Sequence, residues 1–324
     1  QAEDGIRDLV RSRGLGDVYK RQGYNRLGIN GRLGNQMFEY AALRGIAAKH
    51  GYDWCIPPKD RDTNRMADYN IFEGFKLPHL KNFGYVNGPT LNEPNFDFDE
   101  ETFENCPDNV NIDGFRQSEK YFKHIEDEIR EDFEFIDDIY GPCKEFTDQY
   151  DDLIFLHVRR VDATGRPNQF PVASISWYER MLEEHFSKDT PVLILTDKLD
   201  WVKEQELFKQ DRFLLSEQRE YSPNAVWNGR GKLEYSLSPW VDLCLMSLCS
   251  GAIVPNTTFG WWGAWLQKSK DKKIVCQFPY FGPDFTNRCD SYKYMKDFFP
   301  EGWIRGDLND DIDTKYTTAE NEIN

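Results

Sequence analysis

Short apolar runs alternate with amphipathic segments in the second half of the chain. Runs rich in β-branched and aromatic residues predict strands at 153–158, 191–196, 212–215, 251–255 and 272–278. Apolar residues at helical spacing predict helices between them, at 177–186, 199–208, 238–250 and 260–269. Strands that are apolar throughout and alternate with helices are typical of a parallel sheet that helices cover on both faces.

The first half begins its regular pattern with a glycine-containing loop, "GRLGNQ" at 31–36, and a helix that ends at Gly51. A short strand at 53–56 is stopped by two prolines. The segment 59–111 is rich in Asn, Asp, Pro and Gly and predicts loops and short elements. Loop, helix and strand in this order are typical of α/β architecture.

The clearest amphipathic helix is predicted at 118–135, where Phe122, Ile125, Ile129 and Phe133 form one apolar stripe. The charged segment that follows contains a Gly-Pro pair and suits a crossing between two lobes. The alternation of strands and helices begins directly after it.

The length of 324 residues favours two domains, because one domain averages ~150 residues. We predict an α/β fold with an N-terminal lobe at 23–150, a C-terminal lobe at 151–324 that ends in an extension, and a cleft between them. Residues 1–22 have no clear apolar face, and we interpret them as a tail or a non-native extension.

Acidic residues outnumber basic ones, 56 to 40, which gives a net charge of -16 and a pI near 4.8. Such a charge excludes a general nucleic-acid-binding or anionic membrane surface, so any phosphate site must be local. Seven scattered cysteines without a CxxC pair favour free thiols in a reducing compartment. Because the chain shows no run of ~18 apolar residues and no signal-peptide pattern, we expect a cytoplasmic or peripherally membrane-associated protein. The alternative is a Golgi protein whose anchor segment is missing from this chain, and the oligomeric state is not indicated.

Two arginines and an aspartate follow the strand at 153–158, in "HVRRVD". Alternation along the strand places His157 and Arg159 on one face and Arg160 on the other. One guanidinium can clamp a diphosphate at two points, while the other pairs with a carboxylate such as Asp162. A salt-bridged strand end is the alternative, and it leaves the histidine unexplained. Since ligands bind at the carboxyl ends of parallel strands, we expect an anion site here.

Two helix starts carry small and polar residues that suit an anion or a sugar oxygen. Gly34 and Asn35 precede the first long helix, where the alternative is a plain helix cap by Asn35. Asn256, Thr257 and Thr258 stand between a strand and a helix, where hydroxyl and N–H groups could form a phosphate cup.

Two aspartates each allow two roles. Asp242 stands on an otherwise apolar helix, and it could accept hydrogen bonds from a guanine edge or lie on the polar side of the helix. Asp197 ends the strand at 191–196, and it could contact a sugar or a base, or cap the next helix.

Together these stretches resemble the α-1,2-fucosyltransferases, glycosyltransferase family 11. The resemblance rests on "GRLGNQMFEYAALRGIA", "DGFRQSEKYF", "HVRRVD" and "LMSLCSGAIVPNTTFGWWGAWL", which occur in the family's order from about Leu27 to about Phe281. The chain departs from the family pattern at Val161, where glycine is usual, and in "TTFGWW", which replaces a more usual Ser-Thr-Phe-Ser-Trp-Trp.

The resemblance implies a GT-B-like arrangement of two Rossmann-like lobes and an inverting transfer of L-fucose. The donor would be GDP-fucose, the acceptor the 2-hydroxyl of a terminal galactoside on a glycan, and no metal or other cofactor would be needed. No nucleic-acid partner is expected.

By the same resemblance, Arg159 would hold the β-phosphate of the donor, and His157 and Asp242 would contact guanine. Thr257 and Thr258 would bind phosphate oxygens, and Gly34 and Asn35 would lie at the reacting sugar. We also place Arg160, Asn256 and Phe259 on the donor side. The catalytic set is then Arg159, Asn35 and Asp162, the last as the candidate carboxylate base that takes the acceptor proton.

Three other functions are compatible with part of the pattern. The chain could be a transferase of the same group that forms another linkage, or a non-catalytic carbohydrate-binding protein with a Trp-rich surface. A metal-dependent GT-A transferase would need a DxD motif at a strand end, and the candidates at 60–62 and 97–99 lie in loop-like sequence.

Overall fold

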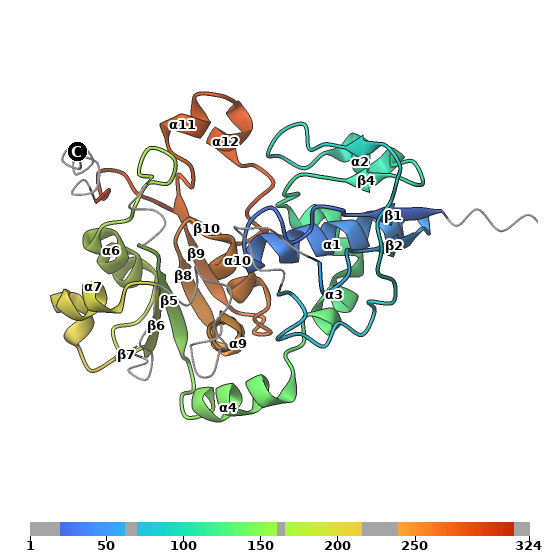
Figure 1. Ribbon diagram of the computed structural model, residues 1–324. Coiled ribbons are helices and arrows are strands. Elements are labelled where there is room, and N and C mark those ends of the chain that lie inside the picture. The colour runs from blue at the N-terminus through green and yellow to red at the C-terminus, as the bar shows by residue number, and fades with distance from the viewer. Residues whose placement is uncertain (1–19, 62–69, 161–165, 216–238, 314–324) are drawn as a thin grey trace, which may run out of the picture.

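The computed structural model describes residues 20–61, 70–160, 166–215 and 239–313, which form two α/β lobes (Figure 1). The N-terminal lobe has a parallel sheet in the order β2-β1-β4-β3. Its strands are short: β1 (Arg21–Gly23), β2 (Asp53–Cys55), β3 (Thr90–Leu91) and β4 (Asn111–Ile112). The predicted α/β class with parallel sheets is confirmed.

The sheet of the C-terminal lobe is parallel and has the order β10-β9-β8-β5-β6-β7. Its strands are β5 (Ile154–Val158), β6 (Val192–Thr196), β7 (Phe213–Leu215), β8 (Gly251–Val254), β9 (Lys273–Phe278) and β10 (Ile304–Asp307). Strands β5, β6 and β7 are added one after another towards one edge of the sheet. The chain then returns, and β8 pairs with the other side of β5. This is the doubly wound order, with its switch point between β5 and β8.

Helices pack around and between the sheets. In the N-terminal half they are α1 (Leu33–His50), α2 (Glu100–Asn105), α3 (Glu126–Asp132) and α4 (Asp137–Thr147), with 3-10 turns at Glu119–Tyr121 and Lys123–Ile125. In the C-terminal half they are α6 (Ile175–His185), α7 (Leu199–Glu204), α9 (Pro239–Leu248), α10 (Thr258–Trp265), α11 (Pro283–Thr286) and α12 (Asp290–Tyr294), with a 3-10 turn at Glu206–Lys209. None of the helices in the described ranges is long and apolar enough to cross a membrane.

The helix predicted at 118–135 is wrong as a single element. The backbone leaves helical geometry at Phe122 (φ -130°, ψ 4°) and at Ile125 (φ -122°, ψ 30°), so the segment forms two 3-10 turns and α3. The carbonyl of Tyr121 lies so close to Gly45 of α1 that a Cβ there would collide with it. Tight contact with α1 therefore overrides the local helical pattern.

Two boundaries also differ from the prediction. The expected crossing after residue 135 is α4, a helix that contains Pro142 and leads from one lobe to the other. The first strand begins at Arg21, so two residues of the predicted tail belong to the sheet. Residues 1–19 of that tail lie outside the described residues.

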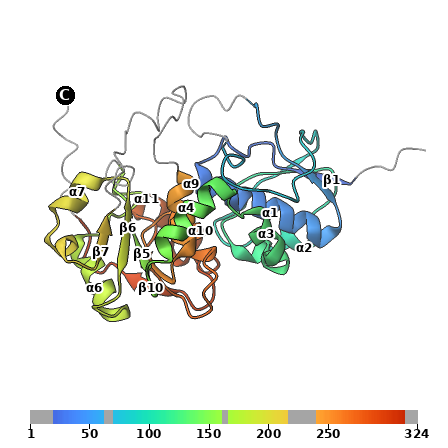
Figure 2. The same ribbon diagram turned by 90° about the horizontal axis from the view of Figure 1, so that it is seen from below.

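A continuous hydrophobic core joins the two lobes. Trp262 of α10 packs against Phe38, Phe122 and Phe133 of the N-terminal lobe, with ring centroids 5.0, 5.5 and 5.2 Å away. Figure 2 shows α4, α9 and α10 at the boundary between the lobes. Because this core includes residues of α1 as well as α10, packing determines how the two helix starts face each other.

Candidate active site

The switch point of the C-terminal sheet brings two predicted motifs together. Arg159 directly follows β5, and Asn256 follows β8, the strand paired with β5. The guanidinium of Arg159 donates a hydrogen bond to the backbone carbonyl of Asn256. Doubly wound sheets bind ligands outside the carboxyl ends of their strands at this position. The predicted anion site therefore lies where the topology favours one.

Arg159 is held in place from two directions. Besides its bond to Asn256, its guanidinium lies 5.1 Å from the ring centroid of Phe170. The side chain is partly exposed, so the guanidinium is anchored beside the start of α10 without being enclosed. This leaves a cation at the edge of the sheet, where a diphosphate could bind.

The segment before α10 forms a capped helix start. Thr257 is the N-cap in an extended conformation (φ -143°, ψ 133°), and its hydroxyl accepts a hydrogen bond from the Phe259 N–H at 3.2 Å. The Asn256 side chain is buried, and its amide donates to the carbonyls of Pro171 (3.0 Å) and Tyr280 (3.1 Å). Asn256 thus holds the loop with its side chain and Arg159 with its carbonyl. That makes it a positioning residue rather than a side-chain ligand.

Gly34 and Asn35 meet this helix start from the other lobe. A Cβ on Gly34 would lie 2.7 Å from the Phe259 nitrogen and 2.7 Å from Thr258 Oγ1, so only glycine fits. The carbonyl of Gly34 also accepts a hydrogen bond from Trp262 Nε1 at 3.0 Å. In Figure 1 the first turn of α1 lies against α10 at the boundary between the lobes.

Asn35 links the two lobes through one oxygen. Its Oδ1 accepts hydrogen bonds from Thr258 Oγ1 at 3.0 Å and from Gln117 Nε2 at 2.9 Å. The N-cap position of α1 is occupied by Arg32, without a side-chain cap bond, so the alternative of a plain helix cap by Asn35 is excluded. Sequence reasoning missed Gln117, although it stands in the quoted segment "DGFRQSEKYF".

Arg160 points away from Arg159, as strand alternation predicts. Its guanidinium forms an ion pair with Asp313 at 2.6 Å, donates to the Ala173 carbonyl at 3.2 Å and lies 4.0 Å from the Trp201 ring centroid. With 2% exposure it is an interior residue, so we assign it to the fold and not to the donor. Its expected partner Asp162 lies outside the described residues.

Asp197 does not cap the next helix, and its contact with a sugar or base stays a prediction. Its Oδ1 accepts a hydrogen bond from the backbone N–H of Arg160 at 2.7 Å. The N-cap of the following helix α7 is Lys198. Asp197 therefore connects the ends of the neighbouring strands β5 and β6.

His157 is buried beneath the start of α10. Its Nδ1 has no hydrogen-bond partner among the described residues, and its ring centroid lies 6.0 Å from that of Phe259. A Cβ on Gly260 would lie 2.8 Å from Nδ1. Burial, with a contribution from the positive charge of Arg159, lowers the pKa of His157 to about 3. The imidazole is therefore neutral at physiological pH.

This burial predicts a specific sensitivity to acid. Because the folded pKa lies below the unfolded value of about 6.5, the unfolded chain takes up a proton that the folded chain refuses, and stability falls as pH drops from about 6.5 towards 3. We expect the difference in unfolding free energy between the parent and His157→Gln to shrink by about 1.4 kcal/mol per pH unit in that window. Urea unfolding of both proteins at several pH values measures it. A difference that does not change with pH would contradict the buried neutral histidine.

Asp242 lies in the first turn of α9 and is partly exposed. The helix packs on α10, so the residue belongs to the same lobe as His157. Its contact with guanine stays a prediction.

The DxD candidate at 97–99 does not follow a strand and its aspartates have other partners. Asp99 caps α2 through Thr102 N–H at 3.1 Å, and its other oxygen pairs with Arg116 at 2.9 Å. Asp97 lies 3.8 Å from Lys296 Nζ, and Asp62 is outside the described residues. Within the described ranges, no group of three or more His, Cys, Asp or Glu side chains is arranged to hold a metal ion.

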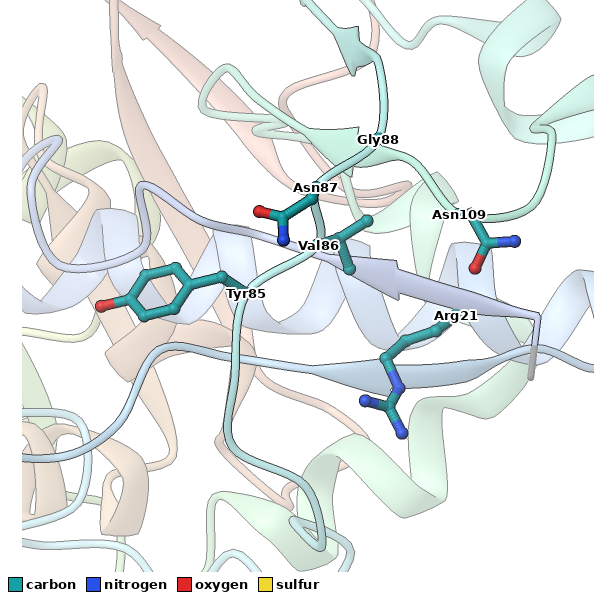
Figure 3. Close-up of a pocket in the computed structure, with 6 residues that line it drawn as sticks. All are labelled: Arg21, Tyr85, Val86, Asn87, Gly88 and Asn109. Atoms are coloured by element: carbon teal, nitrogen blue, oxygen red, sulfur yellow. The ribbon is translucent and has the colours of Figure 1, made fainter. Parts of the chain in front are cut away.

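A shallow surface hollow of about 370 Å³ lies elsewhere on the N-terminal lobe. Figure 3 shows its lining, with Arg21 and Asn109 on one side of Val86 and Tyr85 on the other. Arg21 opens β1 and Asn109 precedes β4, so the hollow borders the amino ends of these strands. None of the candidate site residues lines it.

Comparison with known proteins finds similarity over most of the chain. The family model described as Glycosyl transferase family 11 matches residues 16–304. An α-1,2-colitosyltransferase of Escherichia coli is 24% identical over 309 residues, covering 86% of this chain and 97% of that protein. Galactoside α-(1,2)-fucosyltransferase 1 of Pan troglodytes is 25% identical over 305 residues, covering 90% of this chain and 76% of that protein.

Among solved structures, NodZ α-1,6-fucosyltransferase soaked with GDP-fucose aligns with a TM-score of 0.48 at 15% identity, over 76% of this chain and 92% of that chain. The match of the family model extends over most of the chain and includes both helix starts, Arg159 and the strands that carry them. The chain therefore belongs to glycosyl transferase family 11.

Proposed function

We propose that this protein transfers L-fucose from GDP-fucose to the 2-hydroxyl of a terminal galactoside, with inversion and without a metal ion. The observation that carries the proposal is the position of Arg159 beside the start of α10 at the sheet's switch point. The relatives named as α-(1,2)-fucosyltransferases support the sugar and the linkage.

The charge of the site favours a nucleoside diphosphate. The chain as a whole carries a net charge of -16, so a phosphate must find its positive charge locally. Arg159 supplies a guanidinium fork, and the N-terminus of α10 adds the partial positive charge of a helix start. Thr257 stands at the same helix start, and its hydroxyl can donate to a phosphate oxygen while it accepts from the Phe259 N–H. The Thr258 hydroxyl donates to Asn35 in this structure and would have to turn from it to reach a phosphate.

These groups would act when the bond to the leaving group breaks. An acceptor hydroxyl attacks the anomeric carbon from the face opposite the diphosphate, and negative charge grows on the departing GDP. A positioned donor such as Arg159 stabilises that charge by about 3 kcal/mol. Asn35 would border the reacting sugar from the other lobe, and the base remains a candidate role of Asp162.

The test is a transfer assay with the purified protein, GDP-fucose and a panel of β-galactosides in the presence of EDTA, followed by linkage analysis. We expect an α-1,2-linked fucosyl product at a rate that EDTA does not change. Because one relative is named a colitosyltransferase, GDP-colitose is the second donor to compare. Binding of a galactoside without any affinity for GDP would favour the non-catalytic alternative.

A further inference from the structure

Polar side chains from two segments gather at the carboxyl edge of the N-terminal sheet. Asp113 directly follows β4, and Arg26 and Asn30 belong to the loop between β1 and α1. The Asp113 carboxylate accepts hydrogen bonds from Arg26 Nη1 at 3.3 Å, Asn30 Nδ2 at 3.4 Å and the Gly114 N–H at 2.9 Å. We call Arg26, Asn30 and Asp113 the polar triad.

The chain places the triad close to the contact between the lobes. Asp113 lies four residues before Gln117, and the side-chain amide of Gln117 donates a hydrogen bond to Asn35. The turn between them has positive φ at Gly114 (+111°) and at Arg116 (50°), and the second is an unusual value for a residue with a side chain. The Arg116 guanidinium is fully buried and pairs with Asp99 at 2.9 Å.

The triad retains capacity for a ligand. A carboxylate offers about four lone-pair sites, three of which are used here, and two of the three bonds are long. The Arg26 side chain is 52% exposed and that of Asp113 is 11% exposed. Phe115, two residues beyond Asp113, is 39% exposed. A few convergent polar groups beside exposed apolar surface are what a sugar ring with hydroxyl groups on its rim requires.

The buried neighbour of the triad points to an uncharged ligand. The Glu39 carboxyl is fully buried, and neither oxygen has a hydrogen-bond partner of standard geometry among the described residues. Burial, and next the negative charge of Asp113, raise the pKa of Glu39 well above its usual value, although the Gly28 N–H and Arg26 oppose the shift. Burial thus favours the protonated form of Glu39, and the triad itself contributes one anion, Asp113, and one cation, Arg26.

We propose that the polar triad binds the hydroxyl groups of an uncharged pyranoside acceptor, with Asp113 as its specificity-determining residue. This inference rests on the proposed function, because it takes the N-terminal lobe as the side from which the acceptor attacks. It assigns acceptor recognition to the loop after β1 and the turn after β4, whereas the donor binds at the switch point of the other sheet.

The experiment measures acceptor and donor separately in the full chain. In Asp113→Asn, which keeps the shape and removes the charge, we expect the acceptor KM to rise about tenfold to a hundredfold, the loss typical of a hydrogen bond to a charged group. The kcat should stay within about threefold, and GDP affinity by calorimetry should not change. Asp271→Asn, an exposed aspartate between α10 and β9, is the matched control and should leave all three values unchanged.

Saturation-transfer NMR can measure the binding of methyl β-D-galactopyranoside directly. This test is independent of the transfer assay. The parent should bind this sugar and Asp113→Asn should bind it at least tenfold more weakly. Arg26→Gln changes a more exposed side chain and should also weaken binding of the sugar. This variant tests the proposal if Asp113→Asn does not fold. An unchanged KM, an unchanged sugar affinity, or a lower kcat at constant KM would each overturn the inference. If the parent protein did not bind GDP, that result would instead contradict the proposed function.

Discussion

Arg159→Ala should lower kcat/KM for fucosyl transfer by roughly a hundredfold to a thousandfold, and it should also weaken GDP binding. The guanidinium is the cation at the switch point, and it is held there by the Asn256 carbonyl and the Phe170 ring. Removing one preorganised donor to a developing negative charge has an effect of this size. Steady-state kinetics and calorimetry with GDP measure the two losses, and the melting temperature should change little because the side chain is partly exposed.

Two further variants act as comparisons. The first tests whether the positive charge alone is enough, and the second tests whether the neighbouring arginine serves the fold. Arg159→Lys should recover little activity, because a point charge cannot reproduce the guanidinium fork. Arg160→Met should act on stability instead, by roughly 3–5 kcal/mol, since it leaves Asp313 without its buried partner. If Arg159→Ala transferred fucose at close to the parent rate, the donor site would have to lie elsewhere.

Gly34→Ala should destabilise the protein by about 1–3 kcal/mol and sharply reduce transfer. The added methyl group would lie 2.7 Å from the backbone nitrogen of Phe259, and a backbone cannot rotate away as a side chain can. Helices α1 and α10 would have to separate, which disturbs the hydrogen bond of Asn35 to Thr258 and the helix start beside Arg159. Urea unfolding and the transfer assay measure both effects.

Gly141→Ala is the matched control for this substitution. Gly141 lies within α4, and nothing lies within 4 Å of the position that a Cβ would occupy. Because alanine favours a helix over glycine by about 1 kcal/mol, this variant should be as stable as the parent or more stable. Equal stability of Gly34→Ala and the parent would mean that the two helix starts are not in firm contact.

Much of the C-terminal lobe was predictable because its signals are local. The strands at 153–158 and 272–278 agree with β5 and β9 to within one residue, since both are mainly apolar and mainly buried. Strand alternation also predicted that Arg159 and Arg160 face opposite sides, and the structure confirms it.

Predictions failed where tertiary contacts outweigh a local pattern. The apolar stripe of 118–135 is real, but contact with Gly45 breaks the helix into turns. Asparagine is a common helix cap, yet Asn35 stands inside the first turn of α1. Its side chain accepts hydrogen bonds from Gln117 and Thr258. The sequence shows that a polar residue stands at this position, whereas its role depends on the residues of the other lobe that it contacts.

The sequence by itself determined the α/β class, the strand that Arg159 follows and the face that each arginine takes, because backbone geometry sets these within a few residues. Only the tertiary structure decided the partners: Arg159 with Asn256 at a separation of 97 residues, Arg160 with Asp313 at 153, and Asn35 with Thr258 at 223. Such pairs arise from the strand order and from the packing of α1 on α10. No periodicity of the chain encodes them, because a periodic pattern specifies which face is buried and not what covers it.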